Sequence, residues 1–70
     1  MPAANPQVHI VTVIDRADFD RVMHQSAHRS MQAAHTYAEV IALPIAKAKV
    51  EPEWRHAVDY HIDSINLIGE

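Results

Sequence analysis

Three histidines are the residues of this 70-residue chain whose type and spacing could do chemistry. His24 and His28 are four residues apart, a spacing that in a helix places two imidazoles on one side, where they can bind one divalent metal ion. His35 would project from the same polar side. The three side chains also suit a contact surface that gains charge below about pH 6.5, or a solvated helix face. The sequence leaves these interpretations open and predicts metal ligands only at His24 and His28.

Other chemistry has little support in the sequence. The chain has no cysteine and one glycine, so it lacks a thiol nucleophile, a thiolate zinc site and a glycine-rich phosphate loop. No serine stands in a motif typical of nucleophilic catalysis. We therefore expect a non-enzymatic protein with no cofactor apart from that metal.

Charge and hydropathy narrow the range of partners. The formal net charge is −3, without a basic stripe that would hold nucleic acid. No apolar run approaches the roughly 18 residues of a membrane span. The first residues lack the basic and apolar regions of a secretory signal. We expect protein partners, no nucleic acid or membrane, and a cytoplasmic or virion location without secretion by a signal peptide.

The N-terminal part predicts an arm followed by a strand. Residues 1–7 contain two prolines and no apolar pattern, which is typical of a flexible arm, and residues 8–70 are expected to form a single small domain. Residues 8–14, VHIVTVI, are β-branched at all positions but one, as in a strand. Because a single strand leaves backbone donors and acceptors unpaired, we expect a second copy or another protein to supply its neighbour.

Two helices are predicted after the strand. Residues 16–43 contain neither glycine nor proline, Asp15 suits the N-cap, and Pro44 should end or kink the helix. A second helix is expected over 52–68, with Pro52 in its first turn. Residues 45–50 suit either strand or helix, and a strand over 60–68 competes with the second helix.

Together these elements predict a mainly helical α+β fold: an N-terminal strand, then a long and a shorter helix in a helical hairpin, completed by oligomerisation. A chain of this size buries only about 60% of its unfolded surface, and without disulfides association is the expected support. Self-association should use the strand and the apolar stripes of the helices. The expected interface residues are Val8, Ile10, Thr12, Ile14, Phe19, Tyr37 and Trp54.

Residues 38–65 carry a family resemblance. An alanine-rich helix, then A-K-A-K and a proline, then Y-x-x-D-S-I is similar to the tail-completion and neck proteins of long-tailed bacteriophages. The resemblance implies a long helix packed on an antiparallel sheet, a strand that opens at the Ser-Ile stretch, and a non-enzymatic role in a ring at the head–tail junction.

The sequence therefore predicts an assembly protein, most specifically a small phage-type structural or head–tail junction component. The alternative is a small dimeric helical regulator or inhibitor that binds a host or cellular protein through an exposed helix face. A third hypothesis is a histidine-dependent metal-binding protein.

Overall fold

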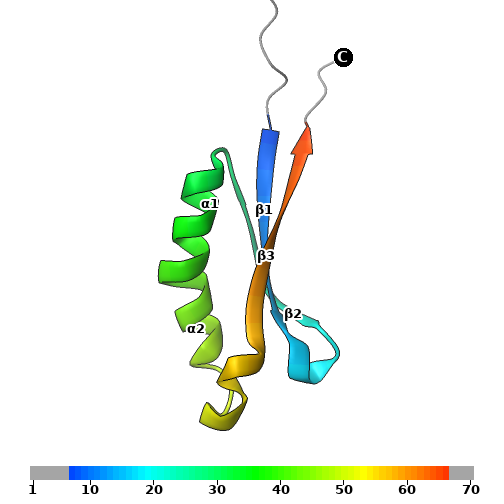
Figure 1. The fold of residues 1–70 in the computed structure, drawn as a ribbon, viewed down its shortest axis with the longest axis vertical. Coiled ribbons are helices and arrows are strands. Elements are labelled where there is room, and N and C mark those ends of the chain that lie inside the picture. The colour runs from blue at the N-terminus through cyan, green and yellow to red at the C-terminus, as the bar shows by residue number, and fades with distance from the viewer. Residues whose placement is uncertain (1–6, 67–70) are drawn as a thin grey trace, which may run out of the picture.

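The computed structural model describes residues 7–66, which form a three-stranded antiparallel sheet with one helical segment against one of its faces (Figure 1). The strands are β1 (Gln7–Asp15), β2 (Arg21–His28) and β3 (Val58–Asn66), in the order β2-β1-β3. The helical segment comprises α1 (Met31–Tyr37), a π-helical turn (Ala38–Ala42) and α2 (Leu43–Lys47). Two 3-10 turns, Arg16–Asp18 and Pro52–Ala57, complete the connections.

The strand β1 lies in the centre of the sheet, so the prediction that residues 8–14 lack a partner within the chain is wrong. Val11, for example, faces Ser26 of β2 on one side and Ile62 of β3 on the other. Both rows of backbone groups on β1 are therefore paired inside one molecule, and the sheet itself does not need a second copy for completion.

The expected mainly helical fold, with its helical hairpin and a helix over 16–43, is also wrong. The chain reverses after β1 and returns as β2, so only the last part of that range is helical. The reversal uses Phe19 and Asp20, whose φ angles are 56° and 57°. Hairpin turns with positive φ usually contain glycine or asparagine. Because neither is present at Phe19 or Asp20, this turn could not be recognised from the usual turn residues.

The helix begins at Met31 and continues through Pro44. Ser30 is its N-cap, with the Oγ atom accepting a hydrogen bond from the Ala33 N–H at 2.9 Å. The prediction that Pro44 ends or kinks the helix fails because the preceding turn is π-helical: the Leu43 N–H donates to the carbonyl of Ala38, five residues back. Such a turn widens the backbone and changes which carbonyls need donors, which lets the helix accept a proline. Of residues 45–50, the first three are helical.

The predicted helix over 52–68 is replaced by a short 3-10 turn and the strand β3. Pro52 does occupy a first helical position, but of this 3-10 turn only. From Val58 to Asp63 burial alternates: Val58, Tyr60 and Ile62 are buried or half-buried, whereas the residues between them are exposed. That two-residue period is the signature of a strand, and cross-strand pairing with β1 decides the competition over 60–66. Residues 67 and 68 lie outside the described range.

The outer edge of β3 carries a local block to further pairing. The backbone N–H of Tyr60 donates to its neighbour's carboxylate, Asp59 Oδ1, at 2.7 Å, so it points away from β1. Alternate residues of a strand direct their backbone groups to the same side. The backbone N–H groups of Ile62 and Ser64 therefore also point away from β1. Asp59 is further held by Arg16, 3.6 Å from its other oxygen.

The core between sheet and helix is built from small side chains. It consists of Val11, Val13 and Val58 with a stripe of four alanines, Ala34, Ala38, Ala42 and Ala46. The alanines recur every four residues and let the helix approach the sheet closely. Eight large apolar side chains are nevertheless exposed: Phe19, Val22, Met31, Val40, Ile41, Ile45, Trp54 and Ile65.

Two further predictions concern the N-terminal arm and the absence of a membrane-spanning segment. Gln7 is the first residue of β1, and the rest of the predicted arm lies outside the described residues. Within residues 7–66 no helix has the length and apolar character to cross a membrane.

Candidate functional site

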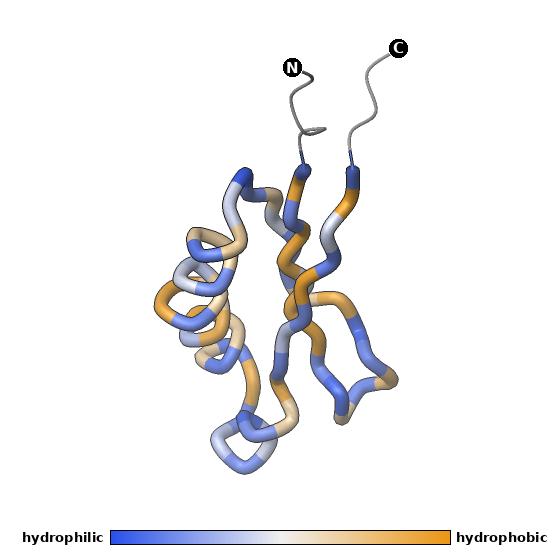
Figure 2. Tube along the Cα trace, turned by 45° about the horizontal axis from the view of Figure 1, so that its top comes forward, coloured by the Kyte–Doolittle hydropathy of each residue, from blue (hydrophilic) through white to orange (hydrophobic). Residues whose placement is uncertain are grey.

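The face of the sheet opposite the helix, here called the open face, has no described element over it (Figure 1). Side chains alternate along β1, and Val11 and Val13 point to the helix, so the even-numbered residues point the other way. Four predicted interface residues therefore share the open face: Val8, Ile10, Thr12 and Ile14. Figure 2 shows hydrophobic residues along β1.

Neighbouring strands extend this surface. Cross-strand partners share a face, so Val22 and Ala27 of β2 and Ile65 of β3 join the open face. Val22 is 54% exposed and Ile65 49% exposed. Each of the three strands thus contributes apolar side chains to the open face. They are interrupted at Thr12, whose hydroxyl accepts a hydrogen bond from Gln25 Nε2 at 3.2 Å.

One margin of the open face is acidic. Asp59, His61 and Asp63 of β3 lie opposite Ile14, Thr12 and Ile10. All three are exposed, and His61 Nε2 lies 3.3 Å from Asp63 Oδ2. A polar margin beside an apolar centre is the usual composition of a protein–protein interface.

The hairpin between β1 and β2 carries another predicted interface residue at its tip. Phe19 is 99% exposed, and both Phe19 and Asp20 adopt left-handed backbone conformations. For residues other than glycine the left-handed region costs about 1–2 kcal/mol each. An aromatic side chain held in solvent on a strained turn has no stabilising role inside this molecule.

On the β2 side of the helix, Tyr37 gathers two of the histidines. His24 Nε2 lies 2.9 Å from the Tyr37 hydroxyl, and the His28 ring lies 4.8 Å from the Tyr37 ring, centroid to centroid. His28 Nε2 also contacts Ser26 Oγ at 2.8 Å. The sixth predicted interface residue is thus half-buried and fixes the helix to β2.

The predicted metal ligands lie on a strand, so the helical spacing that suggested them does not exist. Four residues along a strand separate two Cα atoms by about 13 Å, whereas four along a helix separate them by about 6 Å. Nowhere in residues 7–66 do three His, Cys, Asp or Glu side chains gather in a way that could hold a metal ion. A metal on His24 and His28 stays a prediction that would need ligands from another molecule.

His35 lies on the other flank of the helix, so the expectation of one shared histidine face is wrong. His35 Nδ1 lies 3.2 Å from the Tyr60 hydroxyl, which donates to Glu39 Oε2 at 3.0 Å. The pKa of Tyr60 is raised above 10.0, first by loss of solvent and then by the hydrogen bond and negative charge of Glu39 and the charge of Asp59. The hydrogen bonds that link Tyr60 to His35 and Glu39 fix the helix to β3.

A small notch lies between the helix and β2. Its volume is about 50 Å³, which is room for three or four water molecules. It is lined by Met23, His24, Tyr37, Ala42, Ile45, Ala46 and Lys49. Of these side chains Lys49 alone is permanently charged, so the notch is apolar with a positive rim.

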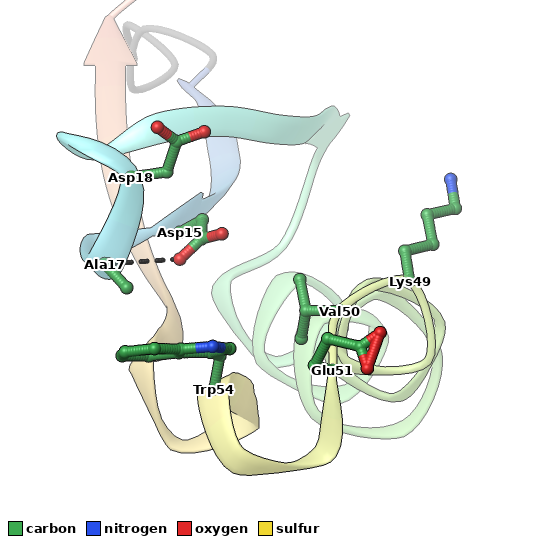
Figure 3. A pocket seen from close by; sticks show the side chains of 7 residues that line it. All are labelled: Asp15, Ala17, Asp18, Lys49, Val50, Glu51 and Trp54. Atoms are coloured by element: carbon green, nitrogen blue, oxygen red, sulfur yellow. Dashed lines mark hydrogen bonds between the residues drawn. The ribbon is translucent and has the colours of Figure 1, made fainter.

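Trp54, the last predicted interface residue, lines a wide hollow of about 370 Å³ beside the hairpin (Figure 3). Its indole lies next to Asp15, whose Oδ1 accepts a hydrogen bond from the Ala17 N–H at 3.1 Å. Asp15 is buried, and Arg21 is 3.9 Å from its other oxygen. The carboxylate thus fixes the start of the turn that follows β1.

The chain was also compared with protein-family models, curated proteins and solved structures, and none of them matches it. The features that sequence reasoning missed, the notch and its lysine, come from segments that are distant along the chain. No periodicity in the sequence could have brought Met23 and Ile45 together.

Proposed function

We propose that this chain is a non-enzymatic assembly protein that packs its open face against the open face of a second copy. The observation that carries the proposal is the composition of β1. Antiparallel strands with one solvated face alternate apolar and polar residues, whereas strands covered on both faces are apolar throughout. Toward the open face β1 carries Val8, Ile10 and Ile14 with Thr12 between them, although the elements within residues 7–66 cover only the other face of the sheet.

The size of the open face supports an interface of modest extent. Three strands of about nine residues, spaced by about 4.8 Å and rising about 3.3 Å per residue, span on the order of 400 Å². A stable interface buries about 800 Å² per partner. The open face can therefore form the centre of an interface, and contacts elsewhere have to supply the rest.

The most specific role we propose is that of a phage-type structural or head–tail junction component. The resemblance of residues 38–65 to neck and tail-completion proteins implies a long helix on an antiparallel sheet. A helical segment over 31–47 on a three-stranded antiparallel sheet is compatible with that architecture.

A small regulator that binds a host or cellular protein is the alternative. Its support is the outer side of the helix, where Val40 is 66% exposed and Ile41 is 43% exposed. A dimer with no tendency to assemble further would favour the regulator, whereas rings or larger assemblies would favour the structural role.

The experiment is a concentration series in light scattering and analytical ultracentrifugation. The test variant is Val22→Asp with Ile65→Asp, two half-exposed positions of the open face that a folded monomer tolerates. Its control is Val40→Asp on the helix, which adds a carboxylate at a valine that is 66% exposed and lies away from the open face.

We expect the wild type and the control to associate at micromolar concentration, and the test variant to be a folded monomer by circular dichroism. A wild type that stays monomeric up to millimolar concentration would contradict the proposal.

A further inference from the structure

We infer that the tip of the β1–β2 hairpin is a self-docking element: Phe19 of one copy enters the notch between the helix and β2 of a second copy, and Asp20 pairs with Lys49 there. The inference rests on the self-association proposed above and adds a second, separate contact to it. Both halves of the contact, the projecting ring and the notch, are present on every copy.

The tip has the properties of an anchor. Phe19 is almost fully exposed, and the left-handed backbone that presents it is unfavourable for phenylalanine. Strained backbone of this kind is concentrated at active sites, ligand clamps and switch regions. Aromatic anchors that fill pockets on a partner dominate the binding energy of many interfaces.

The charges around the tip fit the charges around the notch. Asp18 is already bound to Arg21 at 2.7 Å, whereas Asp20 takes part in no ion pair within residues 7–66. On the notch, Lys49 is likewise outside every ion pair of the described segment, and no carboxylate lines the notch. The carboxylate of Asp20 beside the Phe19 ring and the ammonium group of Lys49 beside the notch therefore complement each other across the contact. The open face, by contrast, would place Asp20 beside the carboxylates of β3.

The tip cannot fill the notch of its own molecule. Met23, which lines the notch, lies in β2 only four residues after Phe19, so the tip could turn back only by breaking the strand that forms one wall. The notch of a second copy is accessible. Because the tip and the end of α2 lie at the same end of the molecule (Figure 1), two copies related by a two-fold axis can make the contact twice.

The notch sets the depth of the contact. About 50 Å³ admits the leading edge of a benzene ring. The exposed side chain of Ile45 at the rim is placed to cover the face of the ring. The flexible four-carbon side chain of Lys49 can then reach the carboxylate of Asp20, the residue that follows the docked Phe19.

The first test compares dissociation constants, measured by ultracentrifugation, of the wild type, Phe19→Ala and the matched control Val40→Ala. We expect Phe19→Ala to weaken association at least tenfold and the control to change it less than twofold. Asp20→Lys and Lys49→Asp should each weaken association, and the double variant with the charges exchanged should restore it to within about threefold of the wild type.

The second test uses the absence of cysteine from the chain. Asp20→Cys and Lys49→Cys variants, prepared separately, are mixed under mild oxidation, so that a mixed disulfide can join only two different molecules. The control mixture contains Asp20→Cys and Val40→Cys. We expect the 20–49 disulfide to form at least ten times faster than the 20–40 disulfide.

The outcomes separate the inference from the proposed function. A monomeric wild type would overturn both. A wild type that associates and is disrupted by the open-face variant, but not by Phe19→Ala, would overturn the docking inference and leave the proposed function intact. A loss in Phe19→Ala without rescue by the exchanged charges, or equal rates for the two disulfides, would show that the ring binds elsewhere and would also overturn it.

Discussion

The two faces of the sheet differ in a way that is opposite to ordinary packing. Toward the helix, Val11 and Val13 are fully buried against a stripe of alanines. Toward the open face, the same strand carries the larger Ile10 and Ile14, which are only half-buried. A small domain that depends on its own core would place its largest apolar side chains inside. The covered face therefore holds the monomer together, whereas the open face is the one that we propose packs against a second copy.

The strongest test of this comparison exchanges neighbouring residues for aspartate. Val11→Asp should unfold the protein, because an unpaired carboxylate buried in the core costs several kcal/mol out of a typical total of about 5–15 kcal/mol. Ile10→Asp should leave the circular dichroism spectrum of the folded chain unchanged and should weaken its association. Equal behaviour of the two variants would remove the distinction between the faces.

A second prediction concerns the closeness of the helix to the sheet. Ala38→Leu should destabilise the fold by about 1–3 kcal/mol, measured by urea unfolding, because three extra carbons do not fit a fully buried alanine site. Ala33→Leu, on the exposed side of the same helix, is the matched control and should change stability by less than about 0.5 kcal/mol. A mild effect at Ala38 would mean that the covered face is loosely packed.

A third prediction follows from the raised pKa of Tyr60, whose hydroxyl helps to fix the helix over the covered face. Because the folded state holds the phenol protonated above pH 10, the unfolded state ionises first, and the free energy of unfolding should fall as the pH rises from 10 through the folded pKa. Tyr60→Phe should abolish this fall and, through the lost hydrogen bonds, cost about 0.5–1 kcal/mol at pH 7.

Urea unfolding at pH 9, 10 and 11 measures this dependence. Tyr37→Phe is its control, since it removes a tyrosine–histidine contact on the other flank and leaves the Tyr60–Glu39 pair in place. The same alkaline fall in wild type and Tyr60→Phe would contradict the assignment.

The smallest expected effect lies at the hairpin tip, away from both faces. Phe19→Asn should stabilise the isolated fold by up to about 1 kcal/mol, because asparagine tolerates the left-handed conformation. Thermal unfolding at a concentration low enough to keep the chain monomeric measures the gain. A loss of stability would show that the ring contributes to the monomer after all.

The strand in residues 8–14 could be predicted from the sequence, because a run of β-branched residues is a local signal. The rest of the sheet depends on contacts between distant segments. The stretch from Val22 to His28 has a helix-compatible composition, and only pairing with β1 makes it a strand. In β3 the alternation of Val58, Tyr60 and Ile62 was present but shorter than the competing helical pattern. Ser30 was a usable N-cap signal, hidden by the longer helix predicted around it.

Of the candidate site, the sequence analysis named Val8, Ile10, Thr12 and Ile14 because of the expected backbone pairing with another molecule. That these four side chains share the face opposite the helix follows only from the sheet and the position of the helix. The notch could not be predicted, because its lining comes from β2, both halves of the helix and the residue Lys49 beyond its end. The positions of His24 and His28 were misjudged because a period of 3.6 was applied to residues of a strand, whose side chains follow a period of two.

The carboxylate of Asp59 has one more consequence. It accepts the hydrogen bond of the outward-pointing Tyr60 N–H. An incoming strand therefore cannot use this donor, and the outer edge of β3 is interrupted as a site for strand pairing. The exposed edge of a sheet is a template on which strands of other molecules can pair and aggregate. The Asp59 side chain removes one backbone donor from this edge and so opposes the pairing of β3 with a strand of another molecule.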